Sequence, residues 1–206
     1  MTRYEIPVTG KAIKYLLIAN AAVFLLQLLT GRALINLGSL IPYHTFIWGQ
    51  FWRTFTYMFL HSPVNFFHII FNMFILWQFG LAIENIWGSR RFILFYFICG
   101  VGSSLFSLFS LFDPVARFIP VIGASGAVIG VLTAYAYFYP QSKVLLFFVI
   151  PMNIKIVVIG YAIISFFGAF GAGGGTISHL THLGGIVVAY IYLKIYPIFY
   201  KKRFVR

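Results

Sequence analysis

The feature that most constrains this chain is a series of six apolar stretches, each close to the roughly 20 residues that a helix needs to cross a ~30 Å hydrocarbon core. In lipid, every backbone amide and carbonyl must find its partner inside the protein, so we expect these stretches to be helices. The sequence predicts an all-α polytopic membrane protein, with residues 1–206 forming a single domain of six transmembrane helices. The predicted spans cover approximately residues 12–30, 65–83, 91–112, 124–140, 153–171 and 178–198.

Composition agrees with a protein built for lipid. Of the 206 residues, 61% are hydrophobic and only 9% are charged, whereas soluble domains carry about 25% charged residues. The net charge of +12 would suit nucleic acid, but the basic residues collect at the ends of apolar stretches and not on one face. We therefore expect no nucleic acid as a partner, and we predict no cofactor or metal site.

The basic residues also predict an orientation. If the segment before the first span is cytoplasmic, twelve of the 15 lysines and arginines fall inside, and only Arg32, Arg53 and Arg117 fall outside. Because cytoplasmic loops are enriched in lysine and arginine, both termini are predicted to be cytoplasmic. The start of the chain lacks the layout of a cleaved signal peptide, so we expect the first span to be retained. We expect a bacterial-type cytoplasmic (inner) membrane.

Two connecting segments need separate interpretations. Residues 31–64 are too apolar for a solvated loop and too interrupted for a span. They are expected to form a structured element in the outer interface, although an ordinary belt of aromatic anchors would have the same composition. The run 144–150 ends at Pro151 and is too short to cross, so we interpret it as an interfacial segment.

Reaction chemistry is concentrated in two short motifs, Gly123-Ala124-Ser125-Gly126 and Thr181-His182-Leu183-Gly184-Gly185. A serine and a histidine are the minimum parts of a nucleophile and its base. Ser125 to Pro140 covers roughly 22 Å of helix, which is short of the hydrocarbon core, so Ser125 is expected below the outer surface. His182 lies about one turn into the last span, at a comparable depth. The alternative is that the glycines serve only helix packing.

Three further polar residues lie near these motifs in the predicted bundle. His179, three residues before His182, is expected to be peripheral because no glycine lies behind it. His68 and Asn72 are spaced i, i+4 and therefore project from one face of the second span. They could hold one helix to another, or they could donate hydrogen bonds to a developing oxyanion.

Taken together, these residues make the chain resemble the rhomboid family of intramembrane serine proteases over nearly its whole length. Any one motif is a weak signal, but the set in this order is specific. The matching residues are Gly49-Gln50-Phe51-Trp52-Arg53, His68-x-x-x-Asn72, Glu84 with Gly88-Ser89, Gly123-x-Ser125-Gly126 and His182-x-x-Gly185.

The resemblance implies a six-helix rhomboid-like bundle with a long structured external loop between helices 1 and 2. It implies that Ser125 is the nucleophile and His182 the general base, with the Ser125 amide, His68 and Asn72 forming the oxyanion site. Structural roles are implied for Trp52, Arg53, Glu84, Gly123, Gly126 and Gly185. Many family members have an aromatic residue one turn after the serine, where this chain has Ile129.

The function expected is endopeptidase cleavage in or near transmembrane segments, through a Ser-His dyad and an acyl-enzyme. The partners expected are the lipid bilayer and single-span or multi-span membrane protein substrates. The alternatives are a catalytically silent rhomboid-like protein that binds membrane helices for quality control, and, more remotely, a small transporter, although the chain shows no internal repeat. The three acids of the chain, Glu5, Glu84 and Asp113, are all placed away from His182, so no triad carboxylate is predicted. Asp113 is expected to cap its loop or to pair with Arg117.

Overall fold

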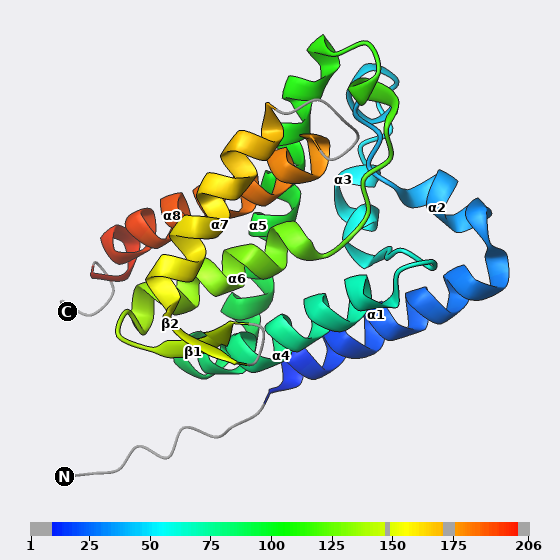
Figure 1. Cartoon of the computed structure of the whole chain (residues 1–206). Helices are drawn as coiled ribbons and strands as arrows, with labels where there is room; N and C mark the ends of the chain where they lie inside the picture. The colour runs from blue at the N-terminus through cyan, green and yellow to red at the C-terminus, as the bar shows by residue number, and fades with distance from the viewer. Residues whose placement is uncertain (1–9, 147–148, 171–175, 202–206) are drawn as a thin grey trace, which may run out of the picture.

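The computed structural model describes residues 10–146, 149–170 and 176–201, and within these ranges the chain is mostly helical (Figure 1). Helices lie in all six apolar ranges, with ends that differ by a few residues from those expected. The long helices are α1 (Lys11–Thr30), α4 (Phe66–Trp87), α5 (Ser89–Ser104), α6 (Ser125–Phe138), α7 (Ile154–Ala169) and α8 (Thr176–Lys201).

Among the described residues, three segments are long and apolar enough to cross a membrane by themselves. They are α1, α4 and the segment Ser89–Phe112, in which α5 continues as the 3₁₀ segment η3 (Leu105–Phe112). The helices α6 and α7 are apolar but shorter. With 14 residues, α6 extends only ~21 Å at 1.5 Å per residue. Its length and apolar character suit a helix enclosed by others inside an integral membrane protein.

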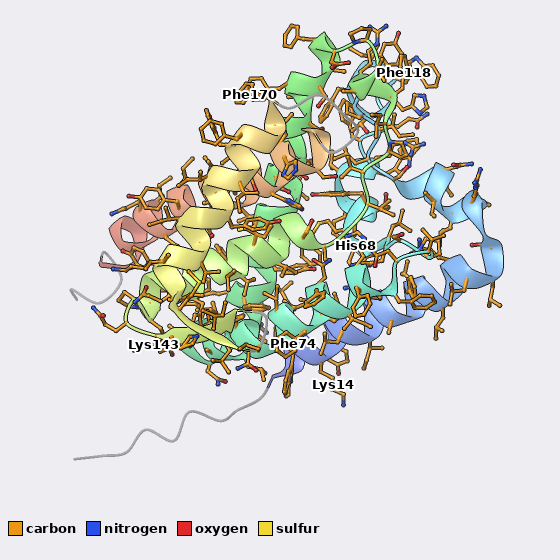
Figure 2. The ribbon with its side chains drawn as sticks, in the orientation of Figure 1. Lys14, His68, Phe74, Phe118, Lys143 and Phe170 are labelled. Carbon is orange, nitrogen blue, oxygen red and sulfur yellow. The ribbon has the colours of Figure 1, made fainter. Side chains whose placement is uncertain are left out.

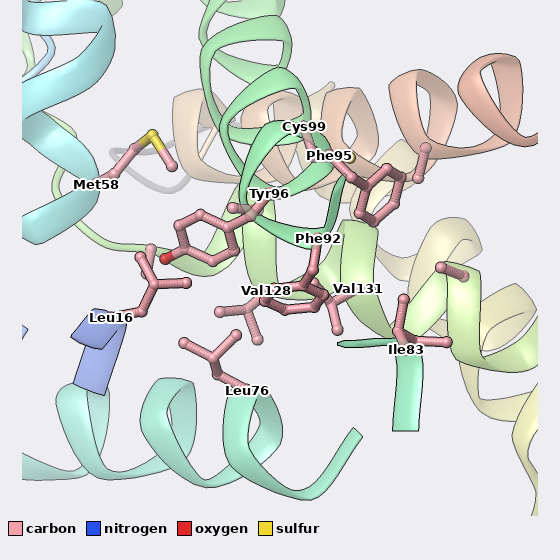
Figure 3. Packing of buried hydrophobic residues seen from close by; sticks show 14 of the residues in the cluster. Leu16, Met58, Leu76, Ile83, Phe92, Phe95, Tyr96, Cys99, Val128 and Val131 are labelled. Atoms are coloured by element: carbon pink, nitrogen blue, oxygen red, sulfur yellow. The ribbon is translucent and has the colours of Figure 1, made fainter. Parts of the chain in front are cut away.

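The core lies where α1, α4, α5 and α6 meet (Figure 3). Phe92, Phe95 and Tyr96 of α5 are fully buried there, in one cluster with Leu76 of α4 and Val131 of α6. The helix α6 packs against α4, α5, α7 and α8, so it is the central helix of the bundle. A residue at the start of α6 is therefore surrounded by the other helices.

Residues 31–64 form a folded element and not a string of separate anchors. They contain α2 (Arg32–Gly38), η1 (Tyr43–Ile47), α3 (Arg53–Thr56) and η2 (Tyr57–Phe59). The buried Tyr57 hydroxyl donates to the carbonyl of Gly100 in α5 at 2.8 Å. Leu40 pairs with Val121, just before α6, in an isolated β-bridge. The element is thereby joined to both α5 and the approach to α6.

Arg53 holds this element together from within, and the exposed Trp52 adds a bond at its surface. The Arg53 guanidinium is buried and donates to the Ser39 carbonyl at 2.7 Å and to the Gln50 side chain at 2.6 Å. The Trp52 indole donates to the Leu37 carbonyl at 3.3 Å. These bonds join α3 to the end of α2, which is what a stabilising role would require.

Glu84 closes the start of α1 from a different helix. Helix α1 has no side-chain cap of its own at Gly10, so the first amides lack partners within the helix. The buried Glu84 carboxylate of α4 accepts from the amides of Ala12 (2.9 Å) and Ile13 (3.1 Å), and from the Ser89 hydroxyl (2.6 Å). A carboxylate at a helix N-terminus also interacts favourably with the helix dipole. Through these bonds Glu84 joins the start of α1 to α4.

The expectation of an all-α fold is wrong at one place. The short run after α6 forms an antiparallel hairpin of β1 (Lys143–Leu146) and β2 (Ile150–Asn153), with Leu145 opposite Pro151 (Figure 1). Two strands joined by a tight connection can satisfy each other's backbone groups over a length too short for a stable helix. Proline, which has no N–H to donate, is tolerated in such an edge strand.

Candidate active site

Ser125 is the first residue of α6, at the end of a non-helical approach. Residues 119–124 are not helical, and the Gly123 amide donates to the Tyr57 carbonyl at 2.9 Å. Gly123 has φ of +129°, a conformation that favours glycine. Helix α6 has no side-chain cap at Ala124, so within the described residues no capping side chain occupies the amides of its first turn, Ser125 included, and they can serve a ligand.

The structure brings Ser125 and His182 together. His182 Nε2 lies 2.8 Å from Ser125 Oγ, and both side chains are half-buried. One turn further along α8, the backbone of Gly185 lies against the backbone of Gly126, leaving no room for a Cβ at Gly185. The glycines thus permit the close approach of α6 and α8 that places the histidine on the serine.

The second ring nitrogen of His182 has a partner that sequence reasoning missed. Tyr161 of α7 places its hydroxyl 2.8 Å from His182 Nδ1, and the two ring centroids are 5.6 Å apart. The available signal was weak, because Tyr161 and Ser165 are two polar residues four apart in a helix that is otherwise apolar after Lys155. Such spacing indicates a common face but does not identify what that face contacts.

The expectation that no glycine lies behind His179 is wrong. Its ring packs directly against Gly168 of α7, where an added Cβ would clash with it. A glycine does therefore lie behind His179, although it belongs to a neighbouring helix and could not be recognised from α8 alone. No hydrogen bond joins His179 to Ser125 in the described part of the chain, and the histidine that faces the serine is His182.

His68 is half-buried and lies against the approach to α6 (Figure 2). Its Nδ1 accepts from the Ser62 amide at 3.3 Å, so the proton of the neutral ring is on Nε2. That nitrogen is the His68 atom nearest to Gly123, where a Cβ would meet it at 2.7 Å. A donor N–H therefore faces the backbone two residues before Ser125.

A second histidine, His61, packs edge-on against His68 with ring centroids 5.1 Å apart. It lies in the connection before α4 and is fully buried. Burial lowers the pKa of His61 to about 4, and the proximity of His68 adds to this effect. His61 is therefore neutral at physiological pH and places no charge beside His68.

Asn72 is placed differently from a free oxyanion donor. Its amide donates to the His68 carbonyl of the same helix at 2.7 Å, and the residue is buried. One of the two amide protons is thereby occupied, which leaves the other for a ligand. Asn72 and His68 share a face of α4, as expected from their spacing.

Within the described residues, the hydrogen-bond partners of His182 are Tyr161 and Ser125, and neither described acid is among them. Asp113 caps its own loop, accepting from the amides of Val115 (2.8 Å) and Ala116 (2.9 Å), and these bonds hold its pKa below the usual range. The guanidinium of Arg117 lies over the rings of Tyr43 and Phe118, so of the two roles expected for Asp113 the contacts favour the cap. Glu84 binds the start of α1. Glu5 is outside the described residues.

Comparison with known proteins gives a consistent result. A Rhomboid domain model matches residues 48–198. The chain is 34% identical over 141 residues to Rhomboid protein 1, mitochondrial, of Saccharomyces cerevisiae, covering 64% of this chain and 38% of that protein. It is 33% identical over 139 residues to Rhomboid protease GluP of Bacillus subtilis, covering 68% of this chain and 25% of that protein.

A third relative, RHOMBOID-like protein 12, mitochondrial, of Arabidopsis thaliana, is 29% identical over 194 residues, covering 85% of this chain and 55% of that protein. The chain thus spans less than two thirds of the length of these relatives. Several of the names are mitochondrial, so the expectation of a bacterial membrane gains no support from them. The family model covers most of the chain, and the motifs it spans include both the serine and the histidine. The chain belongs to the rhomboid family.

Proposed function

We propose that this protein is an intramembrane serine endopeptidase in which Ser125 is the nucleophile and His182 the general base. The observation that supports this most directly is the 2.8 Å separation of Ser125 Oγ and His182 Nε2, which is within hydrogen-bond reach for proton transfer. Membership of a family that includes a named protease, GluP, also supports a protease. Both reacting groups come from α6 and α8, which a contact between glycine backbones holds together.

The proposed reaction follows from the positions of the two groups. Ser125 Oγ attacks the peptide carbonyl while His182 Nε2 takes its proton, and His182 then gives that proton to the leaving amine. The acyl-enzyme formed on Ser125 is hydrolysed by water, with His182 again acting as the base. Because both side chains are only half-buried, water and a peptide can reach them.

The oxyanion is assigned to donors around the start of α6. The free Ser125 amide at the helix N-terminus favours negative charge. His68 Nε2–H faces the adjacent backbone, and the remaining proton of the Asn72 amide lies one turn further along α4. Preorganised donors of this kind stabilise the tetrahedral intermediate more than the ground state.

The membrane arrangement proposed is a single domain of six spans, α1, α4, α5, α6, α7 and α8. Residues 31–64 form the long element on the outer side, and both termini are cytoplasmic. The basic residues support this orientation: Lys14 and Lys143 lie at one end of the molecule, whereas Phe118 and Phe170 lie at the other (Figure 2). Ser125 begins α6 on the side of residues 31–64.

Substrates are proposed to be single-span or multi-span membrane proteins, bound from the bilayer. A peptide bond inside a regular helix is shielded by its own hydrogen bonds. We therefore expect cleavage near helix-weakening glycine or proline, where the chain can extend into the site.

The alternative is a silent rhomboid-like protein that binds membrane helices. Fluorophosphonate labelling in membranes separates the two, because this reagent reacts only with an activated serine. The wild-type protein should be labelled, and Ser125→Ala and His182→Ala should not be. Ser142→Ala, which removes a hydroxyl at the far end of α6, should be labelled like wild type. A wild-type protein that folds but resists labelling would favour the silent alternative.

A further inference from the structure

A polar seam lies between α7 and α8, beside the proposed catalytic pair. On α7 it consists of Tyr161, Ser165 and Gly168, which are spaced to share a face. On α8 it consists of His182 and His179. The Tyr161 hydroxyl lies 2.8 Å from His182 Nδ1, Gly168 contacts the His179 ring, and Ser165 is fully buried.

The direction of the Tyr161–His182 bond follows from the chemistry required at the other nitrogen. His182 Nε2 faces Ser125 Oγ at 2.8 Å and must be unprotonated to accept the serine proton. The proton of the neutral ring is then on Nδ1, which donates to the phenol oxygen of Tyr161. The same bond persists when Nε2 is protonated, because Nδ1 keeps its proton.

We propose that Tyr161 is the positioning residue that holds the tautomer and ring plane of His182, in the place that a carboxylate occupies in a triad. This role rests on the proposed protease function. A neutral phenol satisfies Nδ1 without the desolvation cost of a buried carboxylate. Tyr161 also supplies an aromatic contact from α7, since the ring centroids of Tyr161 and His182 are 5.6 Å apart. On α6, the residue one turn after the serine is Ile129, which has no aromatic ring.

The proposed catalytic arrangement draws on three helices. Ser125 belongs to α6 and His182 to α8, but the group that orients the histidine belongs to α7. The packing of α7 on α8 is therefore part of the catalytic arrangement. A substitution that moves α7 alone should impair His182 while leaving the α6–α8 contact intact.

The first test is the rate of fluorophosphonate labelling of the full chain in detergent micelles, measured against reagent concentration. Tyr161→Phe keeps the ring and removes only the hydroxyl. We expect its saturating rate to fall about 10-fold, as for a lost neutral hydrogen bond that leaves a buried donor unpaired, with the half-saturating concentration unchanged. This loss is far smaller than the ~10⁴-fold loss when a triad aspartate is neutralised.

Two further variants separate the hydroxyl from the ring. Tyr135→Phe removes a hydroxyl from α6 that contacts Ser142 at 3.4 Å, and it should be labelled at the wild-type rate. Tyr161→Leu removes both ring and hydroxyl and should be labelled no faster than Tyr161→Phe. If Tyr161→Phe matches wild type while Tyr161→Leu is impaired, only ring packing matters and the hydrogen-bond assignment is overturned.

The second test reads the tautomer of His182 directly, from the nitrogen-15 NMR shifts of its ring without any substrate. Wild type should show a single neutral tautomer with Nδ1 protonated, and Tyr161→Phe should show a mixture. An unchanged spectrum in a folded Tyr161→Phe protein overturns the inference. Because the NMR signal requires no turnover, it decides the role of Tyr161 independently of labelling. A wild-type protein that resists labelling would count against the protease proposal alone.

Discussion

At the scale of single residues, the site depends on which ring nitrogens carry protons. His68 accepts from Ser62 at Nδ1, which leaves Nε2–H as a donor near Ser125. His182 presents Nε2 to Ser125 and Nδ1 to Tyr161. The neighbouring His61 stays neutral because burial lowers its pKa to about 4. In the proposed mechanism, these two neutral rings have opposite tautomers, and they supply a donor and a base.

This assignment predicts unequal effects for the two polar residues of α4. His68→Ala removes a donor aimed at the backbone beside Ser125, so turnover should fall by the ~10²–10³-fold typical of losing one oxyanion-hole donor. Asn72→Ala should reduce it less, because one of its amide protons is already bonded to the His68 carbonyl. The measurement is kcat for a cleaved single-span protein. Wild-type turnover in both variants would show that α4 is only structural.

At the scale of elements, the pairing of α6 with α8 decides whether the serine and histidine meet. Gly185 leaves no room for a Cβ because the Gly126 backbone occupies that space. Gly130 of α6 packs against the side chain of Cys99 in α5. Close backbone approach of this kind is a common means of helix association in membranes, where burial from water does not drive it.

We predict that Gly185→Ala separates α6 from α8. An added methyl group would overlap the Gly126 carbonyl, and overpacking typically costs about 1–3 kcal/mol. The variant should unfold at a lower temperature and lose fluorophosphonate labelling. Gly160→Ala on α7 is the matched control, since a Cβ there meets nothing within 4 Å, and it should resemble wild type. A Gly185→Ala protein with wild-type stability would contradict the proposed packing.

At the scale of the whole molecule, labelled residues mark the two ends of the bundle. Lys14 and Lys143 lie at one end, and Phe118 and Phe170 at the other (Figure 2). Residues 31–64 cover the end at which α6 begins, so that the non-helical approach to Ser125 is enclosed by protein. Irregular backbone within a membrane requires such enclosure or a water-filled cavity.

The orientation can be tested with introduced cysteines. The natural Cys99 is fully buried, so we expect it not to react with the thiol reagent. Arg32→Cys and Lys143→Cys place thiols at exposed positions on the predicted outer and cytoplasmic sides. A membrane-impermeant thiol reagent added to intact cells should label the first and spare the second, and both should react after lysis. The reverse pattern would invert the proposed topology.

The sequence by itself determined the features that depend on local chemistry. Runs of apolar residues near membrane length predicted where the long helices lie, and glycines beside Ser125 and after His182 indicated the close contact that the structure contains. Hydrophobic length and glycine spacing can be read along one segment, because lipid imposes the same requirement on every span.

Only the tertiary structure decided which faces meet. The choice of Tyr161 as partner of His182, the packing of His179 on Gly168, and the bonds from Glu84 to the start of α1 each join segments that are distant in sequence. The hairpin at 143–153 likewise depends on two strands finding each other. Helix rotation and strand pairing are set by the fit of many side chains from different segments, so no single stretch of sequence contains them.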